Sequence, residues 1–379
     1  MTLCIISHTK HYEDQNGEIK GWESTVNEIN HLLEIADKII HVAPLHEESP
    51  SSSSFAYINP KKIKFIPLKP SGGKGLKKIS IAWNALFNLK QIRKGIQQAD
   101  ILQFRAPTGI GLYVLPFLKW LNTKPYWVKY AGNWIDPHMP LGNRLQKQWL
   151  LNCLDNQTQV TYNGSWVAKS QFLSLHNPCF TFQEYEQAKS VSKFKTNPHE
   201  EGWTIRFVGS LNKHKGIPII LETLKQLPDE IHIKTIHLIG DGHDRKLYEK
   251  IAEQVDIDIL FHGFLPKLEV YQMLSESHAL LLPSKSEGFP KVVGEAMAFG
   301  CVPIVSKVSC IEDYIIDGEN GFLIKELTPF ALIRCIQDLI KLDLADLQRL
   351  RLKNYNFAKN FTYQQYNQVL KEKIINVRL

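Results

Sequence analysis

The sequence predicts an α/β protein built from two doubly wound domains, each with a parallel sheet. Apolar runs that suit buried strands alternate with amphipathic stretches of helical period through both halves of the chain. Strands separated by helices of this length pair in parallel. The length of 379 residues exceeds what one ordinary hydrophobic core supports, which favours two domains.

In the first half, a buried strand is expected at residues 3–7. A capping box, Thr25-x-x-Glu28, then predicts the start of an amphipathic helix, because its side chains can satisfy free N–H groups of the first turn. We expect the first domain to span residues 1–183. Its later elements are strands at 38–45, 62–69, 100–107 and 125–132 and a helix at 82–98.

The second half repeats the pattern more clearly, so a second domain is expected over residues 203–353. Its strands are expected at 204–211, 234–242, 257–265, 278–283 and 302–307, and its helices at 216–227, 244–255 and 267–276. The segment 184–202 is polar and has no apolar period, which is typical of a linker. Residues 354–379 have the pattern of a last amphipathic helix.

The composition is that of a soluble globular protein, with 44 % hydrophobic and 22 % charged residues. No apolar stretch is long enough to span a bilayer, and the N-terminus lacks the basic segment of a signal peptide. Six cysteines are scattered without a C-x-x-C pair. This argues for reduced thiols in the cytoplasm and against a zinc site or a disulfide framework.

The net charge of +7 is unevenly distributed. No acidic residue occurs between Ser49 and Ala99, whereas ten basic residues do: Lys61, Lys62, Lys64, Lys69, Lys74, Lys77, Lys78, Lys90, Arg93 and Lys94. Such a stretch suits either an ordinary solvated surface or an anionic partner, such as a membrane or a phosphate-bearing acceptor. A nucleic-acid partner is not expected, because no aromatic residues alternate with the cations as in a stacking groove.

The most informative motif places Glu287 and Glu295 on either side of a Gly288-Phe289-Pro290 turn. A buried strand precedes the turn, and Pro290 suits the first position of a helix. The free N–H groups at a helix N-terminus can hold a diphosphate. Two carboxylates beside that position could accept hydrogen bonds from hydroxyls at both ends of the diphosphate, as a nucleotide-sugar would offer. The alternative is an ordinary turn with two solvated glutamates.

The segment 287–306 resembles the donor-binding segment of retaining glycosyltransferases of the GT-B fold, family 4 (glycosyl transferases group 1). The resemblance extends through residues 318–324 and back to 207–216, so it covers the second half well and the first half weakly. It implies two Rossmann-like domains that face each other across a cleft, with the donor mainly on the second domain and the acceptor mainly on the first. It implies that Glu295 binds the ribose and that Glu287 lies beside the transferred sugar. In such proteins the last helix returns to the first domain.

A second group of candidates follows the strands of the second domain. Lys215 lies between a strand and a helix, where its ammonium can meet a diphosphate. In the family an arginine usually follows Gly209, but this chain has Ser210, so Lys213 or another cation must supply a second charge, or the leaving group is less stabilised. The resemblance places Gly263 and Phe264, with His262, in the wall of the base pocket.

The first domain departs further from the family pattern, because the usual histidine after the strand at 125–132 is absent. Asn133 and Asp136 follow that strand and are candidate catalytic groups, as is Arg105 after the preceding strand. Their alternative role is that of ordinary polar loop residues. Gly21 approximately matches a loop glycine that lets the backbone approach the donor phosphates.

These features together predict a retaining, metal-independent glycosyltransferase without a further cofactor. Its donor is expected to be a UDP- or GDP-sugar, and its acceptor a hydroxyl of a glycan or lipid-linked substrate in bacterial surface polysaccharide synthesis. We expect it in the cytoplasm, free or attached to the inner face of the membrane. Metal independence follows from the family and from the absence of a D-x-D motif after a first-domain strand. Two alternatives stay open: a GT-B sugar-nucleotide epimerase and a non-catalytic sugar-nucleotide-binding protein.

Overall fold

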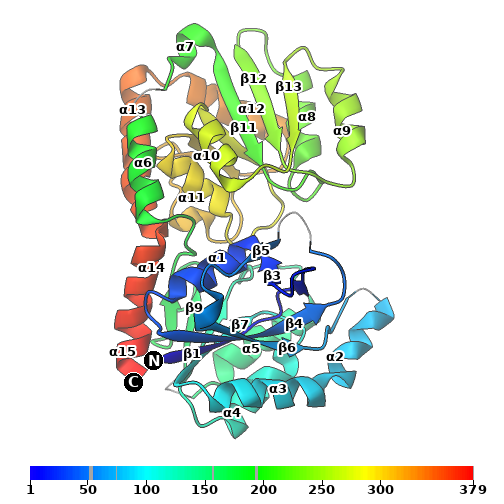
Figure 1. Ribbon diagram of the computed structural model, residues 1–379. Coiled ribbons are helices and arrows are strands. Elements are labelled where there is room, and N and C mark those ends of the chain that lie inside the picture. The colour runs from blue at the N-terminus through cyan, green and yellow to red at the C-terminus, as the bar shows by residue number, and fades with distance from the viewer. Residues whose placement is uncertain (51–53, 74, 156–157, 193–194, 379) are drawn as a thin grey trace. The chain divides into compact units, whose positions relative to one another are not determined.

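The computed structural model describes residues 1–50, 54–73, 75–155, 158–192 and 195–378 (Figure 1). The chain forms two compact units. Unit 1 comprises Met1–His176 and Tyr366–Leu379, and unit 2 comprises Asn177–Gln365. Each unit has a sheet with helices on both faces, so the prediction of two doubly wound α/β domains is confirmed.

The sheet of unit 1 has a parallel core in the order β6-β4-β1-β7-β8-β9-β10. This is the arrangement of a doubly wound fold, in which the strand order reverses beside the first strand. The strands are β1 (Thr2–Ile6), β4 (Lys38–His46), β6 (Ile63–Leu68), β7 (Ile101–Ala106), β8 (Tyr126–Tyr130), β9 (Gln159–Tyr162) and β10 (Phe172–Ser174). The five strands expected in this half are all present.

Three short strands that are not among those expected from the sequence extend this sheet. They are β2 (His11–Glu13), β3 (Ile19–Trp22) and β5 (Ser54–Ala56). β3 pairs antiparallel with both β2 and β5, and β2 pairs with β4. They are too short to show an alternating pattern, and their order comes from pairing with one another and, through β2, with the long strand β4.

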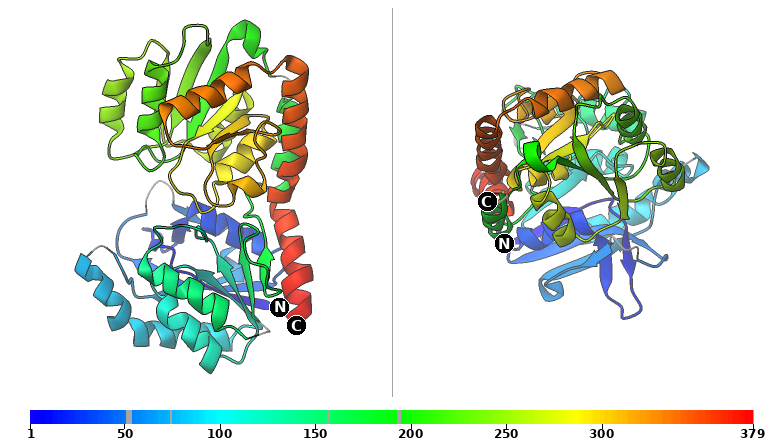
Figure 2. Two further views of the ribbon diagram at one scale, coloured as in Figure 1. Left: turned by 180° about the vertical axis from the view of Figure 1, so that it is seen from behind. Right: turned by 90° about the horizontal axis from the view of Figure 1, so that it is seen from above.

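Alternate side chains of the unit 1 strands enter two separate cores. Cys4 and Ile6 point to one face, where they are buried with side chains of α3 (Ala85–Gln97), α4 (Gly111–Leu121) and α5 (Leu141–Asn152). The short helix α2 (Ser80–Trp83) leads into α3. Figures 1 and 2 show α2, α3 and α4 along this side of the sheet.

The opposite face of the unit 1 sheet is covered by α1 (Glu23–Leu32) and the end of the chain. Leu3 and Ile5 pack there with Val26 of α1 and with Tyr366, Leu370 and Ile374. The terminal elements are α14 (Tyr363–Leu370), a π-helical turn (Lys371–Ile375) and α15 (Asn376–Arg378). The last segment therefore completes the core of unit 1.

Unit 2 has a parallel sheet in the order β13-β12-β11-β14-β15-β16. The strands are β11 (Trp203–Val208), β12 (Ile233–Ile239), β13 (Ile259–Gly263), β14 (Ala279–Leu282), β15 (Val302–Ser306) and β16 (Phe322–Ile324). The helices are α6 (Phe182–Ser192), α7 (Pro198–Glu201), α8 (Ile217–Lys225), α9 (Arg245–Ala252), α10 (Lys267–Ser275), α11 (Lys291–Ala298), α12 (Pro329–Ile340) and α13 (Leu344–Ala358). The order reverses between β11 and β14, and ligands of such sheets bind beyond the carboxyl ends of the strands at this point.

The unit boundaries differ from the expected ones. The expected linker 184–202, of which residues 193–194 lie outside the described part, contains most of α6 and all of α7 and belongs to unit 2. Tyr185 of α6 is buried and stacks on Tyr355 with ring centroids 4.4 Å apart. Among the described side chains of α6, only Tyr185 and Ala188 are buried, and two buried residues do not give the segment a clear apolar period. The expected last helix, 354–379, is divided between α13 and α14, and unit 1 resumes only at Tyr366.

All six cysteines are free thiols. Within the described ranges, no helix combines the length and the apolar character needed to cross a membrane. The same ranges contain no group of three or more His, Cys, Asp or Glu side chains arranged to hold a metal ion.

Candidate functional site

The candidate site in unit 2 is built from the loops that follow β11, β12, β13 and β14. Three glycines end the first three strands, and their backbones are in close contact. A Cβ atom on Gly240 would lie 2.0 Å from the Gly209 carbonyl oxygen, and Gly240 has a φ of +131° that favours glycine. The Gly240 N–H donates to the Gly263 carbonyl at 2.7 Å. Because all three residues are glycines, only backbone groups lie at these strand ends.

A lysine–glutamate pair lies at the switch point itself. Lys215, in the loop after β11, donates through Nζ to both carboxylate oxygens of Glu287, in the loop after β14, at 2.6 and 2.8 Å. The Glu287 side chain is only 7 % exposed, whereas that of Lys215 is 30 % exposed. The ammonium group is therefore held on the solvent side of a nearly buried carboxylate.

Local backbone contacts fix this pair. The side-chain oxygen of Asn212 accepts hydrogen bonds from the N–H groups of His214 and Lys215 at 2.9 and 3.0 Å. The Lys285 N–H donates to the His214 carbonyl at 2.8 Å, which joins the β11 loop to the β14 loop. Gly216 has a φ of +82°, and a Cβ there would lie 2.1 Å from the Pro283 carbonyl oxygen. A side chain at Gly216 would push the two loops apart.

The Gly-Phe-Pro turn leads into α11, one residue later than expected. Pro290 is the N-cap residue and Lys291 the first helical residue. The Gly288 carbonyl accepts a hydrogen bond from Ser309 Oγ at 2.9 Å. The Phe289 ring packs against the rings of Tyr314 and Phe361, with centroids 5.8 and 5.4 Å away. Phe289 therefore anchors the turn, and its side chain is engaged in packing.

Glu295 lies in the middle of α11 and is partly buried. Its negative charge affects the pKa of two buried neighbours. Burial, and then the Glu295 carboxylate, raise the pKa of Tyr271 and of Cys179 well above their ordinary values. The carboxylate thus lies beside protein groups that stay neutral.

Two predicted pocket residues at the carboxyl end of β13, His262 within the strand and Phe264 just after it, have different surroundings. His262 is paired with His237 of β12, Nδ1 of His237 lying 2.8 Å from Nε2 of His262, and the two rings are stacked. Burial, then Arg206, lowers the pKa of His237 to about 4. This pairing supports a structural role for His262. Phe264 is 47 % exposed, so its ring is available for stacking.

Arg245, the first residue of α9, is not part of any motif that the sequence shows. Its Nη2 donates to the Phe261 carbonyl at 3.3 Å and its Nε to Glu249 at 2.7 Å. Its Nη1 lies 3.0 Å from where a Cβ on Gly263 would stand. A cation thus lies at the end of β13, and the only sequence signal for it was a basic residue soon after the Gly240 turn.

In unit 1, the predicted catalytic residues Asn133 and Asp136 lie in the loop after β8, as expected. Asn133 Oδ1 accepts from the Ile135 N–H at 3.1 Å, and Asp136 Oδ1 accepts from the His138 N–H at 2.9 Å. These contacts stabilise the loop, as such side chains commonly do. The structure gives both residues a local structural role.

Arg105 and Gly21 have roles that differ from the predicted ones. Arg105 Nη2 donates to Glu28 Oε1 at 3.0 Å, and Lys129 Nζ donates to the same oxygen at 2.6 Å. The Arg105 side chain is only 12 % exposed, so its charge is committed to a buried cluster. Gly21 was placed in a loop, but it lies in β3, where a Cβ would be 2.3 Å from Nε2 of His11. The missing side chain there makes room for an imidazole ring, which corrects the assignment to a phosphate-binding loop.

A buried polar chain close to β1 was also missed. His41 of β4 is bonded through Nε2 to Ser7 Oγ at 2.8 Å and through Nδ1 to the Tyr57 hydroxyl at 2.6 Å. Burial lowers the pKa of His41 well below its usual value and that of His11 to about 4. Both rings are therefore neutral near pH 7. His41 lies within an apolar run and His11 within a polar one, so their local sequence gave little sign of the network.

Sequence comparison with known protein families matches a segment of unit 2. The family model for glycosyl transferases group 1 matches residues 188–359. The match covers less than half of the chain and lies wholly within unit 2. An uncharacterized glycosyltransferase of Haemophilus influenzae is 29 % identical over 205 residues, which cover 47 % of this chain and 57 % of the relative. A putative colanic acid biosynthesis glycosyltransferase, WcaL, of Salmonella typhimurium is 29 % identical over 173 residues, 43 % of this chain and 42 % of the relative. The chain spans about half the length of these curated relatives.

Solved structures extend the similarity to both units. Sucrose-phosphate synthase from Thermosynechococcus elongatus matches with a TM-score of 0.73 at 15 % identity, covering 100 % of this chain and 99 % of that one. Anabaena HepE in complex with UDP matches with a TM-score of 0.70 at 15 % identity, covering 99 % and 100 %. At this identity the similarity establishes the fold alone, and that fold is GT-B, as predicted.

The glycosyl transferases group 1 match includes the whole candidate site of unit 2. Glu287, Lys215 and Glu295 all lie inside it, whereas Asn133 and Asp136 lie outside. At the position where the family usually has an arginine, Ser210 is exposed. The residues of unit 1 therefore have no support from the family match, and Ser210 offers no positive charge at the arginine position.

Proposed function

We propose that the protein is a retaining glycosyltransferase that moves a sugar from a nucleotide-sugar to a hydroxyl of a glycan or lipid-linked acceptor. The Lys215–Glu287 pair carries this proposal. It joins two loops at the switch point of a Rossmann-like sheet, within the segment matched by the family model. A nearly buried carboxylate that holds a partly exposed ammonium at a strand end is suited to charged, hydroxyl-rich ligands.

The donor would lie along the carboxyl ends of β11 to β14. Its diphosphate would meet Lys215 and the free N–H groups at the start of α11. Glu295 would accept hydrogen bonds from the ribose hydroxyls, and the exposed ring of Phe264 would stack on the base. UDP- and GDP-sugars both fit this description. The similar HepE structure holds UDP, which favours UDP as the first donor to test.

In the transfer step, negative charge grows on the diphosphate as the bond to the sugar breaks. Lys215 would stabilise that charge, and Glu287 would hold the ammonium in place beside the transferred sugar. We propose front-face attack by the acceptor hydroxyl, which gives its proton to the leaving diphosphate and retains the anomeric configuration. Because cationic side chains and helix N–H groups stabilise the leaving group in this scheme, we propose that no metal ion is required.

Arg245 is our candidate for the second charge that Ser210 cannot supply. Its guanidinium lies at the end of β13, next to Gly263. Lys213 is the alternative, and it is exposed in the β11 loop. The variants Arg245→Gln and Lys213→Gln each remove one of these charges. The variant that lowers the affinity for UDP while leaving that for uridine unchanged identifies the cation that contacts the diphosphate.

The setting that we propose is bacterial surface polysaccharide synthesis on the cytoplasmic side of the membrane. It is supported by the relative named for colanic acid biosynthesis and by the stretch 49–99, which has ten basic residues and no acidic one. Lys74 of that stretch lies outside the described residues. The acceptor would then be attached to a lipid or to a growing glycan at the membrane surface.

The test is an assay of a panel of nucleotide-sugars with the full chain, with and without glycan acceptors, followed by NMR. Transfer with retained configuration, unaffected by EDTA, is expected. An inverted product, or activity lost in EDTA and restored by manganese, would contradict the mechanism. Isomerised free sugar would identify an epimerase instead, and donor binding without any turnover would identify a binding protein.

A further inference from the structure

One face of unit 1 is formed by a short 3-10 turn, Gly75–Ile79, and the helices α2 to α5. We refer to the outward side of these elements as the α2–α5 face. None of their residues is Asp or Glu. Six cations on them are exposed and make no ion pair among the described residues: Lys77, Lys78, Lys90, Arg93, Lys94 and Arg144. A helical face with charges of one sign attracts an anionic surface.

The same face also exposes large apolar side chains. Trp83 is 86 % exposed and Leu86 84 %, and both belong to the outward stripe of α2 and α3. One turn before them lies the exposed Ile79, and one turn after them the stripe continues with Lys90. The inward stripe of α3 is buried in the core under the sheet. Ile79, Trp83 and Leu86 therefore do not contribute to the core of unit 1, and basic residues follow them along α3.

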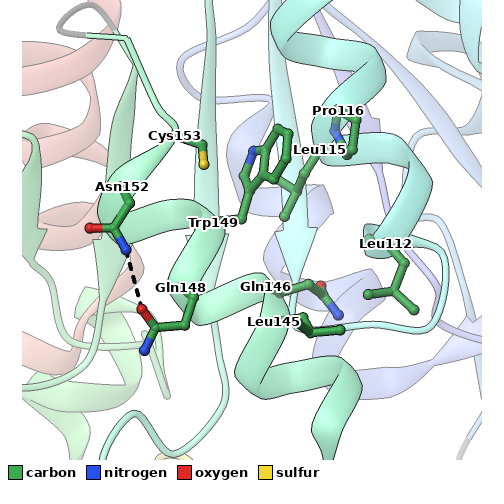
Figure 3. Close-up of a pocket in the computed structure, with 10 residues that line it drawn as sticks. Leu112, Leu115, Pro116, Leu145, Gln146, Gln148, Trp149, Asn152 and Cys153 are labelled. Atoms are coloured by element: carbon green, nitrogen blue, oxygen red, sulfur yellow. Dashed lines mark hydrogen bonds between the residues drawn. The ribbon is translucent and has the colours of Figure 1, made fainter.

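A second apolar region lies on α4 and α5, which cover the same side of the sheet. Trp120 and Leu121 are exposed at the end of α4, and Leu141 and Leu145 at the start of α5. Between the two helices is a groove of about 410 Å³, lined mainly by apolar side chains. Figure 3 shows Trp149, Leu115 and Pro116 at one part of it and Leu112 and Leu145 at another. Isolated exposed apolar residues are common, but contiguous ones usually mark an interaction site.

We propose that the α2–α5 face docks on an anionic lipid membrane. Trp83 and Leu86 would enter the interfacial region, and Lys90, Arg93 and Lys94 would lie at the phosphates. This combination of exposed tryptophan, leucine and unpaired cations is what interfacial helices use. A protein partner would have to be strongly acidic over several helices. The docking itself does not depend on the proposed transferase activity, although the idea that it brings a lipid-linked acceptor to the site rests on that function.

The test is co-sedimentation of the full chain with vesicles of phosphatidylcholine, with and without phosphatidylglycerol. Binding to the anionic vesicles is expected at low ionic strength, where the Debye length is about 30 Å, and should weaken in 1 M salt, where it is about 3 Å. Each Lys or Arg near an anionic leaflet contributes roughly fivefold to partitioning. The variant Lys90→Glu/Arg93→Glu should therefore bind at least about 25-fold less well.

The apolar part of the proposal is tested by Trp83→Ser and Leu86→Ser. Each should weaken binding to anionic vesicles about tenfold, because a large apolar side chain no longer leaves water. The matched control is Phe330→Ser on α12 of unit 2, where Phe330 is 77 % exposed, and it should bind like the wild type. Since all these side chains are exposed, folding should be unaffected, which circular dichroism checks.

Several outcomes would overturn the docking proposal. They are equal binding by all variants, failure to bind anionic vesicles at low salt, and a concentration-dependent dimer that Trp83→Ser abolishes, which would show that a second copy covers the face. Vesicle binding is measured without donor or acceptor. Binding with no transferase activity would refute only the proposed function, and activity on soluble acceptors without vesicle binding would refute only the docking.

Discussion

Each unit contains a nearly buried glutamate whose carboxylate lies 2.6 Å from a lysine Nζ, yet the two pairs differ in access to solvent. In unit 1, Glu28 meets Lys129, which is 7 % exposed, and Arg105, which is 12 % exposed. In unit 2, Glu287 meets Lys215, which is 30 % exposed. The first pair is sealed inside the protein and the second opens at the strand ends. Similar chemistry at similar distance thus suits a structural role in one unit and a ligand-binding role in the other.

The cost of breaking each pair should follow that difference. A buried charge that loses its partner is strongly destabilised, whereas a part-exposed one is solvated by water. The comparison teaches that exposure of the cation, rather than the length of the ion-pair contact, separates a scaffold pair from a candidate site. Four predictions test it, beginning with the largest expected effect.

The variant Glu28→Ala should lower the free energy of unfolding by about 3–5 kcal/mol, because Lys129 and Arg105 would be left as uncompensated buried cations. Urea unfolding followed by circular dichroism measures this. Glu48→Gln, which alters an exposed carboxylate of the same unit, should change stability by less than about 0.5 kcal/mol. If Glu28→Ala is as stable as Glu48→Gln, the sealed pair is not a stabilising element.

The variant Lys215→Ala should cost less stability than Glu28→Ala, because water can reach the position that the partly exposed ammonium leaves beside Glu287. It should reduce turnover about 10²- to 10³-fold, since it removes one preorganised charge from the leaving group. Glu287→Gln should behave in the same direction. The measurement is kcat with a donor that the panel has identified. Lys225→Ala, which removes an exposed cation from the last turn of α8, is the matched control. Near-normal turnover in Lys215→Ala would remove the distinction between the two pairs.

The variant Gly240→Ala tests the backbone contacts that bring the unit 2 loops together. A Cβ there would lie 2.0 Å from the Gly209 carbonyl at a positive φ, whereas Gly318 has a φ of +78° with nothing within 4 Å of the same atom. Gly318→Ala therefore reports conformational strain alone, about 1–3 kcal/mol at most. Gly240→Ala should be less stable than Gly318→Ala in thermal unfolding and should bind UDP less tightly. Equal stability of the two would show that the loops yield easily.

The variant Glu295→Ala should weaken binding of the nucleotide about tenfold or more, because a hydrogen bond to a charged group contributes about 1.5–3 kcal/mol. The fold should be retained. Calorimetry with the ribonucleotide and its 2′-deoxy analogue separates the ribose contact from general charge effects: the wild type should distinguish them and the variant should not. Unchanged affinity for the ribonucleotide would refute the role of Glu295.

Much of the fold could be predicted from local pattern, because burial imposes a period on each element. All five expected strands of unit 1 appear, and the apolar runs of unit 2 form its sheet. The short strands β2, β3 and β5 could not be predicted, since each has three or four residues and owes its order to neighbours. Helix α6 was missed for a related reason: it packs mainly through Tyr185.

For the candidate site, the motif around Glu287 and Glu295 was evident in the sequence, because turn, helix start and carboxylates are close together in the chain. By itself, the sequence also determined the basic bias of residues 49–99 and the identity of the family match. Composition and local spacing can be recognised in the sequence because they do not depend on contacts between distant residues.

Only the tertiary structure decided which of these residues meet. It placed Lys215 on Glu287, 72 positions away, brought Arg245 to the end of β13, and set Gly21 beneath His11 and Arg105 against Glu28. The sheet orders of both units determine these contacts, because strands distant in sequence become neighbours and their loops then share one edge. A contact between residues far apart in sequence depends on the order of the strands, and no local pattern encodes that order.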